Sequence, residues 1–196
     1  MDRIAIFASG SGTNAERIVS YFRKHPSIEV GLILSNRHDA FVLERARELG
    51  IPSAVFGRQQ LYETDFVLNI LKENNITFIV LAGFLWLVPQ NLLTAYSGRI
   101  LNIHPALLPN YGGKGMYGMK VHEAVISSGD KESGITIHNV NERYDAGDIV
   151  FQARCPVLPA DTPESLASRI HALEYEHYPK IIEQQLTAHR SPLTKV

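Results

Sequence analysis

The sequence predicts a single α/β domain built on a doubly wound, mostly parallel open sheet. Short apolar segments without helical periodicity alternate with amphipathic segments, which is the pattern of buried parallel strands and the helices that cover them. The connections between these segments are short enough for right-handed crossovers. The length of 196 residues, of which 45% are hydrophobic and 20% charged, suits one domain with a large core.

The first expected strand, residues 4–8, runs directly into a glycine-rich turn, Ser9-Gly10-Ser11-Gly12-Thr13-Asn14, and a helix follows over residues 15–24. Such a turn brings several backbone N–H groups and the positive end of the helix dipole to one point, which favours phosphate binding. Because no Gly-Lys-Ser/Thr follows, a triphosphate with magnesium is not implied. Two other interpretations stay open: the loose dinucleotide pattern Gly10-x-Gly12-x-x-Ala15, and a turn that serves only tight strand-to-helix packing.

The alternation continues through three further strands. The second strand ends in Ser35-Asn36-Arg37, without the acidic residue that binds a dinucleotide's ribose, which disfavours a dinucleotide. Asp39 is the expected N-cap of the next helix and Gly50 its stop. The most apolar strand, residues 78–81, is expected in the middle of the sheet. The expected elements here are strand 30–34, helix 40–49, strand 53–56, helix 61–74 and strand 78–81.

The fifth strand, residues 99–104, carries an amide and an imidazole two residues apart. Side chains at positions i and i+2 of an extended segment point to the same face, so Asn102 and His104 can address one ligand atom. Pro105 ends the strand because it has no N–H to donate. Open α/β sheets bind ligands at the carboxyl ends of their strands, so this stretch has the outline of a catalytic site.

Beyond this strand, we expect a glycine-rich loop, a short helix, two strands and a long helix. The loop over residues 110–118 has four glycines and no core periodicity, which is typical of functional loops. Asp161 or Thr162 caps the last helix, with Pro163 in its first turn. Residues from Thr187 onward are expected to fray. The expected elements here are helix 122–128, strand 132–140, strand 149–157 and helix 163–186.

These motifs resemble those of the folate-dependent formyltransferases, over residues 4–186. The resemblance implies a Rossmann-like formyltransferase fold as one domain over residues 1–196, with a phosphate-binding half (1–100), a catalytic and folate-binding half (101–186) and a tail (187–196). The motifs that carry it are Ser9-Gly10-Ser11-Gly12-Thr13-Asn14, Leu81-Ala82-Gly83-Phe84, Leu101-Asn102-Ile103-His104-Pro105-Ala106-Leu107-Leu108-Pro109 and Asp145-Ala146-Gly147.

The same resemblance implies an activity and a set of site residues. The activity is formyl transfer from 10-formyltetrahydrofolate to the amine of 5-phosphoribosylglycinamide in de novo purine biosynthesis, since the glycine-rich loop suits a phosphorylated acceptor. The implied residues are Asn102, His104 and Asp145 for catalysis; Gly12, Thr13 and Asn14 for the acceptor phosphate; Glu174 for the glycinamide or ribose end; and Leu85, Trp86, Leu87, Val88, Asn102, Asn141, Glu142, Arg143 and Tyr144 for the folate. Trp86 stands where related enzymes carry Arg, so no polar contact is carried over to it.

The side chains of Asn102, His104 and Asp145 are of the types that formyl transfer requires. Formyl transfer passes through a tetrahedral carbon that bears an oxyanion, and fixed donors placed there accelerate the step. Asn102 offers an amide N–H, and His104 offers a second donor that is stronger when protonated. Asp145 beside His104 is expected to raise the pKa of the imidazole and to pass protons through water. None of these steps needs a metal, a covalent intermediate or a nicotinamide.

The bulk composition disfavours other partners. Nineteen Lys+Arg against twenty Asp+Glu, a net charge of -1, provide no basic field for nucleic acid. The longest apolar run, residues 78–88, is too short to span a bilayer. Cys155 is the one cysteine, so no intrachain disulfide forms, and a reducing, cytoplasmic compartment is expected. The histidines show no metal-ligand spacing. We expect small-molecule substrates and a monomer or homodimer.

Two alternatives remain open at this point. The chain could use the same donor with another acceptor, namely water, an amino sugar or an aminoacyl-tRNA. It could also be a non-catalytic nucleotide or folate sensor built on this fold.

Overall fold

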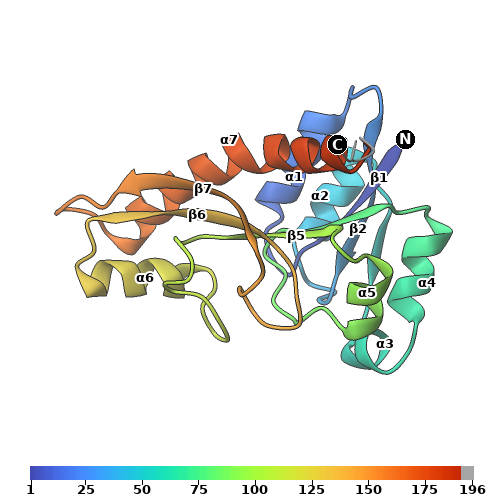
Figure 1. Ribbon diagram of the computed structural model, residues 1–196, viewed down its shortest axis with the longest axis horizontal. Helices are drawn as coiled ribbons and strands as arrows, with labels where there is room; N and C mark the ends of the chain where they lie inside the picture. Colours follow the sequence, from blue (N-terminus) through green and yellow to red (C-terminus); the bar gives the residue numbers. More distant parts are fainter. Residues whose placement is uncertain (191–196) are drawn as a thin grey trace, which may run out of the picture.

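The computed structural model describes residues 1–190 and shows one seven-stranded sheet with helices packed on both of its faces (Figure 1). The strand order is β3-β2-β1-β4-β5-β6-β7. The elements, in chain order, are β1 (Asp2–Phe7), α1 (Thr13–Phe22), β2 (Ile28–Ser35), α2 (Val42–Leu49), β3 (Ser53–Val55), α3 (Arg58–Tyr62), α4 (Phe66–Glu73), β4 (Phe78–Leu81), α5 (Gln90–Ala95), β5 (Ile100–His104), α6 (Met119–Ser128), β6 (Glu132–Asn139), β7 (Ile149–Pro156) and α7 (Pro163–Arg190).

The sheet is parallel from β3 to β5 and antiparallel at β6 and β7. This arrangement confirms the predicted α/β class with a mostly parallel, doubly wound sheet. β4 is the middle strand, as its uninterrupted apolar sequence predicts, and all four of its residues are buried. The strand order reverses between β1 and β4, so the carboxyl ends of β1, β4 and β5 lie next to one another at the point where such sheets bind ligands.

Two apolar layers bury the two faces of the sheet. One contains buried side chains of α1, α2 and α7, including Ile18, Val42 and Tyr178. The other contains those of α3, α4 and α5, including Leu61 and Leu71. Because successive strand residues point to opposite faces, each parallel strand feeds both layers and needs apolar residues throughout.

Two local expectations are wrong. The predicted helix over residues 61–74 is split into α3 and α4, because the Thr64 hydroxyl donates to the Gln60 carbonyl and accepts the Phe66 N–H, which supplies a local alternative to helical hydrogen bonding. Asp39 does not cap α2: its carboxylate pairs with Arg37, and the helix begins later, at Val42.

The last helix begins as expected and extends further than expected. Thr162 Oγ1 accepts the Ser165 N–H and Ser165 Oγ accepts the Thr162 N–H, so Thr162 rather than Asp161 acts as the cap. α7 continues past Leu186 to Arg190, so the fraying predicted from Thr187 does not begin there. The rest of the predicted tail, residues 191–196, lies outside the described residues.

Candidate active site

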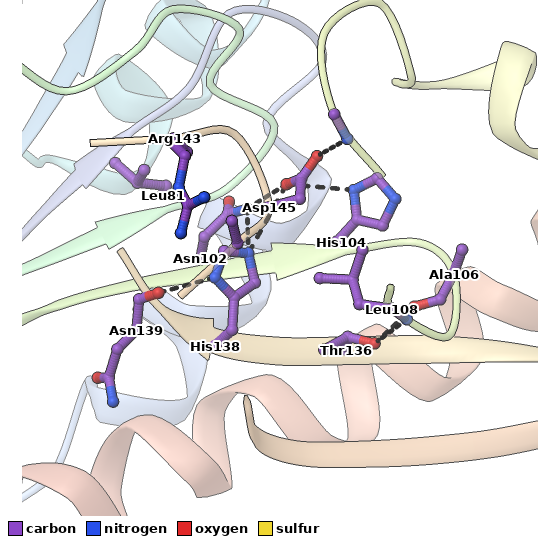
Figure 2. A network of polar contacts seen from close by, with 12 residues as sticks. Leu81, Asn102, His104, Ala106, Leu108, Thr136, His138, Asn139, Arg143 and Asp145 are labelled. Atoms are coloured by element: carbon purple, nitrogen blue, oxygen red, sulfur yellow. Dashed lines mark hydrogen bonds and ion pairs between the residues drawn. The ribbon is translucent and has the colours of Figure 1, made fainter. Parts of the chain in front are cut away.

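β5 presents Asn102 and His104 at the carboxyl edge of the sheet. Both side chains lie on the same face of the strand, as their spacing predicts, and His104 is 3% exposed. The chain that follows is fixed by the buried Thr136 of β6, whose hydroxyl donates to the Ala106 carbonyl at 2.7 Å and accepts the Leu108 N–H at 2.9 Å (Figure 2). The end of β5 is therefore held rigidly where the two polar side chains stand.

Asp145 meets this pair from the loop between β6 and β7 (Figure 2). Its Oδ1 lies 3.5 Å from His104 Nδ1 and 3.4 Å from Asn102 Nδ2, and its Oδ2 accepts the Gly113 N–H at 2.9 Å. The turn is tightly packed, since a Cβ on Gly147 would lie 1.7 Å from the Asn139 carbonyl oxygen. The three residues that the sequence singled out thus converge, although 40 or more residues separate Asp145 from the other two.

His138 of β6 belongs to the same cluster, and its Nε2 lies 3.7 Å from Asp145 Oδ1. It pairs across the sheet with Asn102, whose Nδ2 lies 3.0 Å from His138 Nε2. His138 Nδ1 donates to the Asn139 carbonyl at 2.8 Å, which leaves Nε2 as the acceptor for the Asn102 amide. His138 therefore holds the Asn102 amide in place. In the sequence, the alternation of His138 with apolar residues along β6 was the signal that could have indicated this position.

Burial decides the charge of His104. Desolvation lowers the pKa of this imidazole below 6.5 and outweighs Asp145 and the Tyr111 carbonyl, which both raise it. Asp145 raises the pKa of His104, as expected, but the expected net rise is wrong, because the sequence did not reveal how deeply the ring is buried. For Asp145, burial raises the pKa, but His138 and His104 in their protonated forms, together with the Gly113 N–H, outweigh it and lower the pKa below 3.8.

The tautomer of His104 follows from its contacts. Nε2 lies 2.7 Å from the backbone oxygen of Tyr111, and a carbonyl can only accept, so Nε2 carries a hydrogen. In the neutral ring Nδ1 is then unprotonated and faces the Asp145 carboxylate. The cluster at neutral pH therefore consists of a carboxylate next to an imidazole nitrogen that is able to take a proton.

The glycine-rich loop lies at the start of α1, with Gly12 as the helix N-cap at φ 75°. A Cβ on Gly12 would lie 2.4 Å from the Val42 side chain, so the backbone packs closely against α2. Asn14 Nδ2 donates to Glu174 Oε2 at 2.8 Å, and Glu174 is 5% exposed on α7. His171 Nδ1 lies 3.0 Å from the same oxygen. The structure thus joins two sequence-predicted groups, Gly12 to Asn14 and Glu174, which are far apart in the chain.

The segment after β4 is tied to the same loop. Ser9 Oγ accepts the Leu85 N–H at 3.0 Å and donates to Asn36 Oδ1 at 2.6 Å. Val88 is buried, whereas Leu85, Trp86 and Leu87 are half-buried. Trp86 packs among aromatic rings, with the Arg58 guanidinium 5.1 Å above its ring centroid. These contacts with neighbouring side chains are enough to explain an apolar residue at position 86.

The segment from Asn141 to Tyr144 forms the start of the β6–β7 loop that carries Asp145. Asn141 shapes the turn, since its Oδ1 accepts the Arg143 N–H and its Nδ2 donates to the Ala146 carbonyl. Glu142 and Arg143 are exposed. Burial and, after it, the phenol of Tyr144 raise the pKa of Tyr62, whose hydroxyl donates to the Leu87 carbonyl at 3.1 Å. Tyr62 is therefore hydrogen-bonded to one sequence-predicted folate segment and interacts electrostatically with the other.

Two further findings concern metal binding and membrane-spanning helices. Within residues 1–190, no group of three or more His, Cys, Asp or Glu side chains is placed to hold a metal ion. No helix in the same part of the chain combines the length and the apolar character that crossing a membrane requires.

Comparisons with known proteins agree with one another. The family model described as formyl transferase matches residues 2–182. A phosphoribosylglycinamide formyltransferase of Haemophilus influenzae is 37% identical over 188 residues, which cover 93% of this chain and 86% of that protein. The crystal structure of a phosphoribosylglycinamide formyltransferase from Bacillus halodurans superposes with a TM-score of 0.86 at 37% identity, covering 99% of this chain and 100% of that one.

Plant relatives are longer. The chloroplastic phosphoribosylglycinamide formyltransferase of Arabidopsis thaliana is 41% identical over 186 residues, which cover 92% of this chain and 64% of that protein. The matched residues cover 60% of the relative from Vigna unguiculata. The chain therefore spans about three fifths of the length of these two plant proteins.

Proposed function

The chain belongs to the formyl transferase family, and on that premise we propose that it transfers the formyl group of 10-formyltetrahydrofolate to the amine of 5-phosphoribosylglycinamide. The products are 5-phosphoribosyl-N-formylglycinamide and tetrahydrofolate, a step of de novo purine biosynthesis. The observation that carries the proposal is the convergence of Asn102, His104 and Asp145 at one edge of the sheet.

The acceptor would lie between α1 and α7. Gly12, Thr13 and Asn14 offer backbone N–H groups at a helix N-terminus, where a phosphate is stabilised by both hydrogen bonds and the helix dipole. Glu174 would meet the glycinamide or ribose end, and Asn14 holds it there. The buried Oδ1 of Asn14 has no hydrogen-bond partner, which supports a ligand hydroxyl or N–H at this point.

The formyl donor would lie on the other side of the three catalytic residues. Leu85, Trp86, Leu87 and Val88 supply an apolar edge after β4. The turn from Asn141 to Tyr144, in which Glu142 and Arg143 are exposed, supplies polar groups. An apolar edge with polar groups at its rim suits a flat heterocyclic ligand.

The reaction begins with a proton transfer. The acceptor's ammonium must lose a proton before its nitrogen can attack, and the unprotonated Nδ1 of His104 takes it directly or through Asp145 and water. The nitrogen then forms a bond to the formyl carbon, and the carbonyl electron pair moves to oxygen. The imidazolium and the Asn102 amide donate to that oxyanion, so His104 already carries a positive charge when the negative charge develops on oxygen.

Collapse of the tetrahedral carbon completes the transfer. The oxyanion re-forms the carbonyl, the bond from carbon to N10 breaks, and N10 receives a proton that the former amine loses. Asp145 is the group that passes this proton, because its pKa is lowered and it stays a carboxylate at neutral pH. The proton first taken from the ammonium returns to solvent from His104.

A turnover assay with matched acceptors tests the proposal. Purified protein is mixed with 10-formyltetrahydrofolate, and tetrahydrofolate release is followed with 5-phosphoribosylglycinamide, with the corresponding riboside that lacks the phosphate, and with no acceptor. We expect rapid release with the ribonucleotide and slow release with the other two. Release without an acceptor would indicate a hydrolase, whereas preference for an amino sugar or an aminoacyl-tRNA would indicate another acceptor. Binding without turnover would indicate a sensor.

The setting we propose is that of a small-molecule enzyme in the cytoplasm, acting as a monomer or homodimer. The free, buried Cys155 supports a reducing compartment. The near balance of 19 basic and 20 acidic side chains supports small substrates rather than nucleic acid.

A further inference from the structure

Tyr111 occupies a backbone conformation that tyrosine rarely adopts. Its φ is 57°, in the left-handed region that favours glycine or asparagine. The two residues that follow it are glycines, yet this position carries a tyrosine. In this conformation its backbone oxygen accepts the hydrogen of His104 Nε2 at 2.7 Å. A bulky residue is strained in this conformation, so a contact of its side chain must compensate for the strain.

The side chain of Tyr111 is anchored at the carboxyl end of α6. The phenol oxygen lies 2.6 Å from Asp130 Oδ2 and 2.6 Å from Ser128 Oγ. The Asp130 carboxylate raises the pKa of the phenol, which therefore stays protonated and donates to it. The ring also packs against the apolar layer that contains α7. One residue thus connects the end of α6 to the imidazole on β5.

We propose that Tyr111 is a positioning residue for His104: its phenol, held by Asp130, keeps the backbone oxygen on Nε2 and so fixes Nδ1 as the nitrogen that takes the proton. The inference rests on the proposed function, since it concerns the imidazole assigned there. Tyr111 touches no substrate in this scheme. Without the anchor, the ring can turn or change tautomer, and Nδ1 then carries the hydrogen in part of the population.

The groups that face His104 set the expected pH effect. They are Asp145 from the β6–β7 loop, His138 from β6, His122 from α6 and Glu174 from α7. The Tyr111 oxygen accepts from the ring and raises the pKa of His104. Weakening this bond therefore lowers the pKa of His104 further, and the acid limb of the pH–rate profile moves to lower pH.

Tyr111→Phe tests the proposal, with Tyr21→Phe as the matched control. Tyr21 donates to Glu183 at 2.5 Å, so the control also removes a phenol–carboxylate bond but lies on α1 away from His104. We expect Tyr111→Phe to lower kcat about tenfold, the kinetic equivalent of one lost hydrogen bond, with both KM values within about twofold. Asp130→Ala should give the same loss, and the double variant should lose no more. Tyr21→Phe should keep the wild-type kcat.

A second readout does not depend on turnover. In the wild-type protein, ¹⁵N chemical shifts of His104 should report a hydrogen on Nε2, and in Tyr111→Phe or Asp130→Ala a mixture of tautomers. This measurement stays valid even if the ribonucleotide is not the acceptor, so it separates the two proposals. An unchanged tautomer, a kcat within twofold of wild type, or a loss that Tyr21→Phe shares would overturn the role of Tyr111. If Tyr111→Phe fails to fold, Asp130→Ala carries the test.

Discussion

Gly147→Ala should disable the site by displacing the carboxylate without removing any functional group. A Cβ at this position would lie 1.7 Å from the Asn139 carbonyl oxygen, so the turn must move by about 1.7 Å to reach an ordinary contact of 3.4 Å. Asp145 lies in this turn, and its Oδ1 is 3.5 Å from His104 Nδ1. A misplacement of about 1 Å costs on the order of 10²-fold in rate.

The assay is steady-state release of tetrahydrofolate with both substrates saturating. We expect Gly147→Ala to lower kcat about a hundredfold, while its melting curve stays cooperative. Gly57→Ala is the matched control, because its Cβ would meet nothing closer than 3.8 Å, and it should keep the wild-type kcat. A folded Gly147→Ala protein with a kcat within threefold of wild type would refute the reasoning.

Three other predictions follow from charge and packing. Because burial lowers the pKa of His104 below 6.5 and its neutral form takes the proton, kcat should fall on the acid side with a midpoint below pH 6.5; a midpoint above pH 6.5 would contradict this. Gly12→Ala would place a Cβ 2.4 Å from the Val42 side chain and shift the loop, so the ribonucleotide KM should rise about tenfold with the folate KM unchanged in initial-rate assays. Arg169 lowers the pKa of Asp161, so the ion pair stabilises the fold at pH values above the ordinary carboxyl pKa of 3.8. In calorimetry, the difference in Tm between wild type and Asp161→Asn should therefore shrink as the pH falls below about 3.8. A difference that stays constant would contradict the pairing.

Much of the fold was predictable because its signals are local. Apolar runs without helical period mark the parallel strands, and the run at residues 78–81 identifies the central one. The elements that were mispredicted also depend on local signals, but those signals are weaker. The break at Thr64 depends on a hydroxyl that competes with helical hydrogen bonds, and composition alone does not reveal which way such a hydroxyl turns.

The site was predictable only in part, because its members lie far apart in the sequence. Asn102 and His104 follow from strand geometry, but nothing in the turn around Asp145 says that it returns to β5. That link came from the resemblance to a family. The charge of His104 was mispredicted because burial depends on the packed fold. Tyr111 was missed because its contact to His104 is made by a backbone oxygen, which carries no side-chain signal.

The most direct test of the catalytic unit is the turnover number of His104→Ala, Asp145→Asn and the double variant, measured by tetrahydrofolate release. Since His104 and Asp145 lie 3.5 Å apart and act as one unit on the two protons of the acceptor nitrogen, each single change should lower kcat by several orders of magnitude, and the double change should lower it little further than the worse single one. Near-normal rates in both single variants, or losses that multiply in the double variant, would contradict the account.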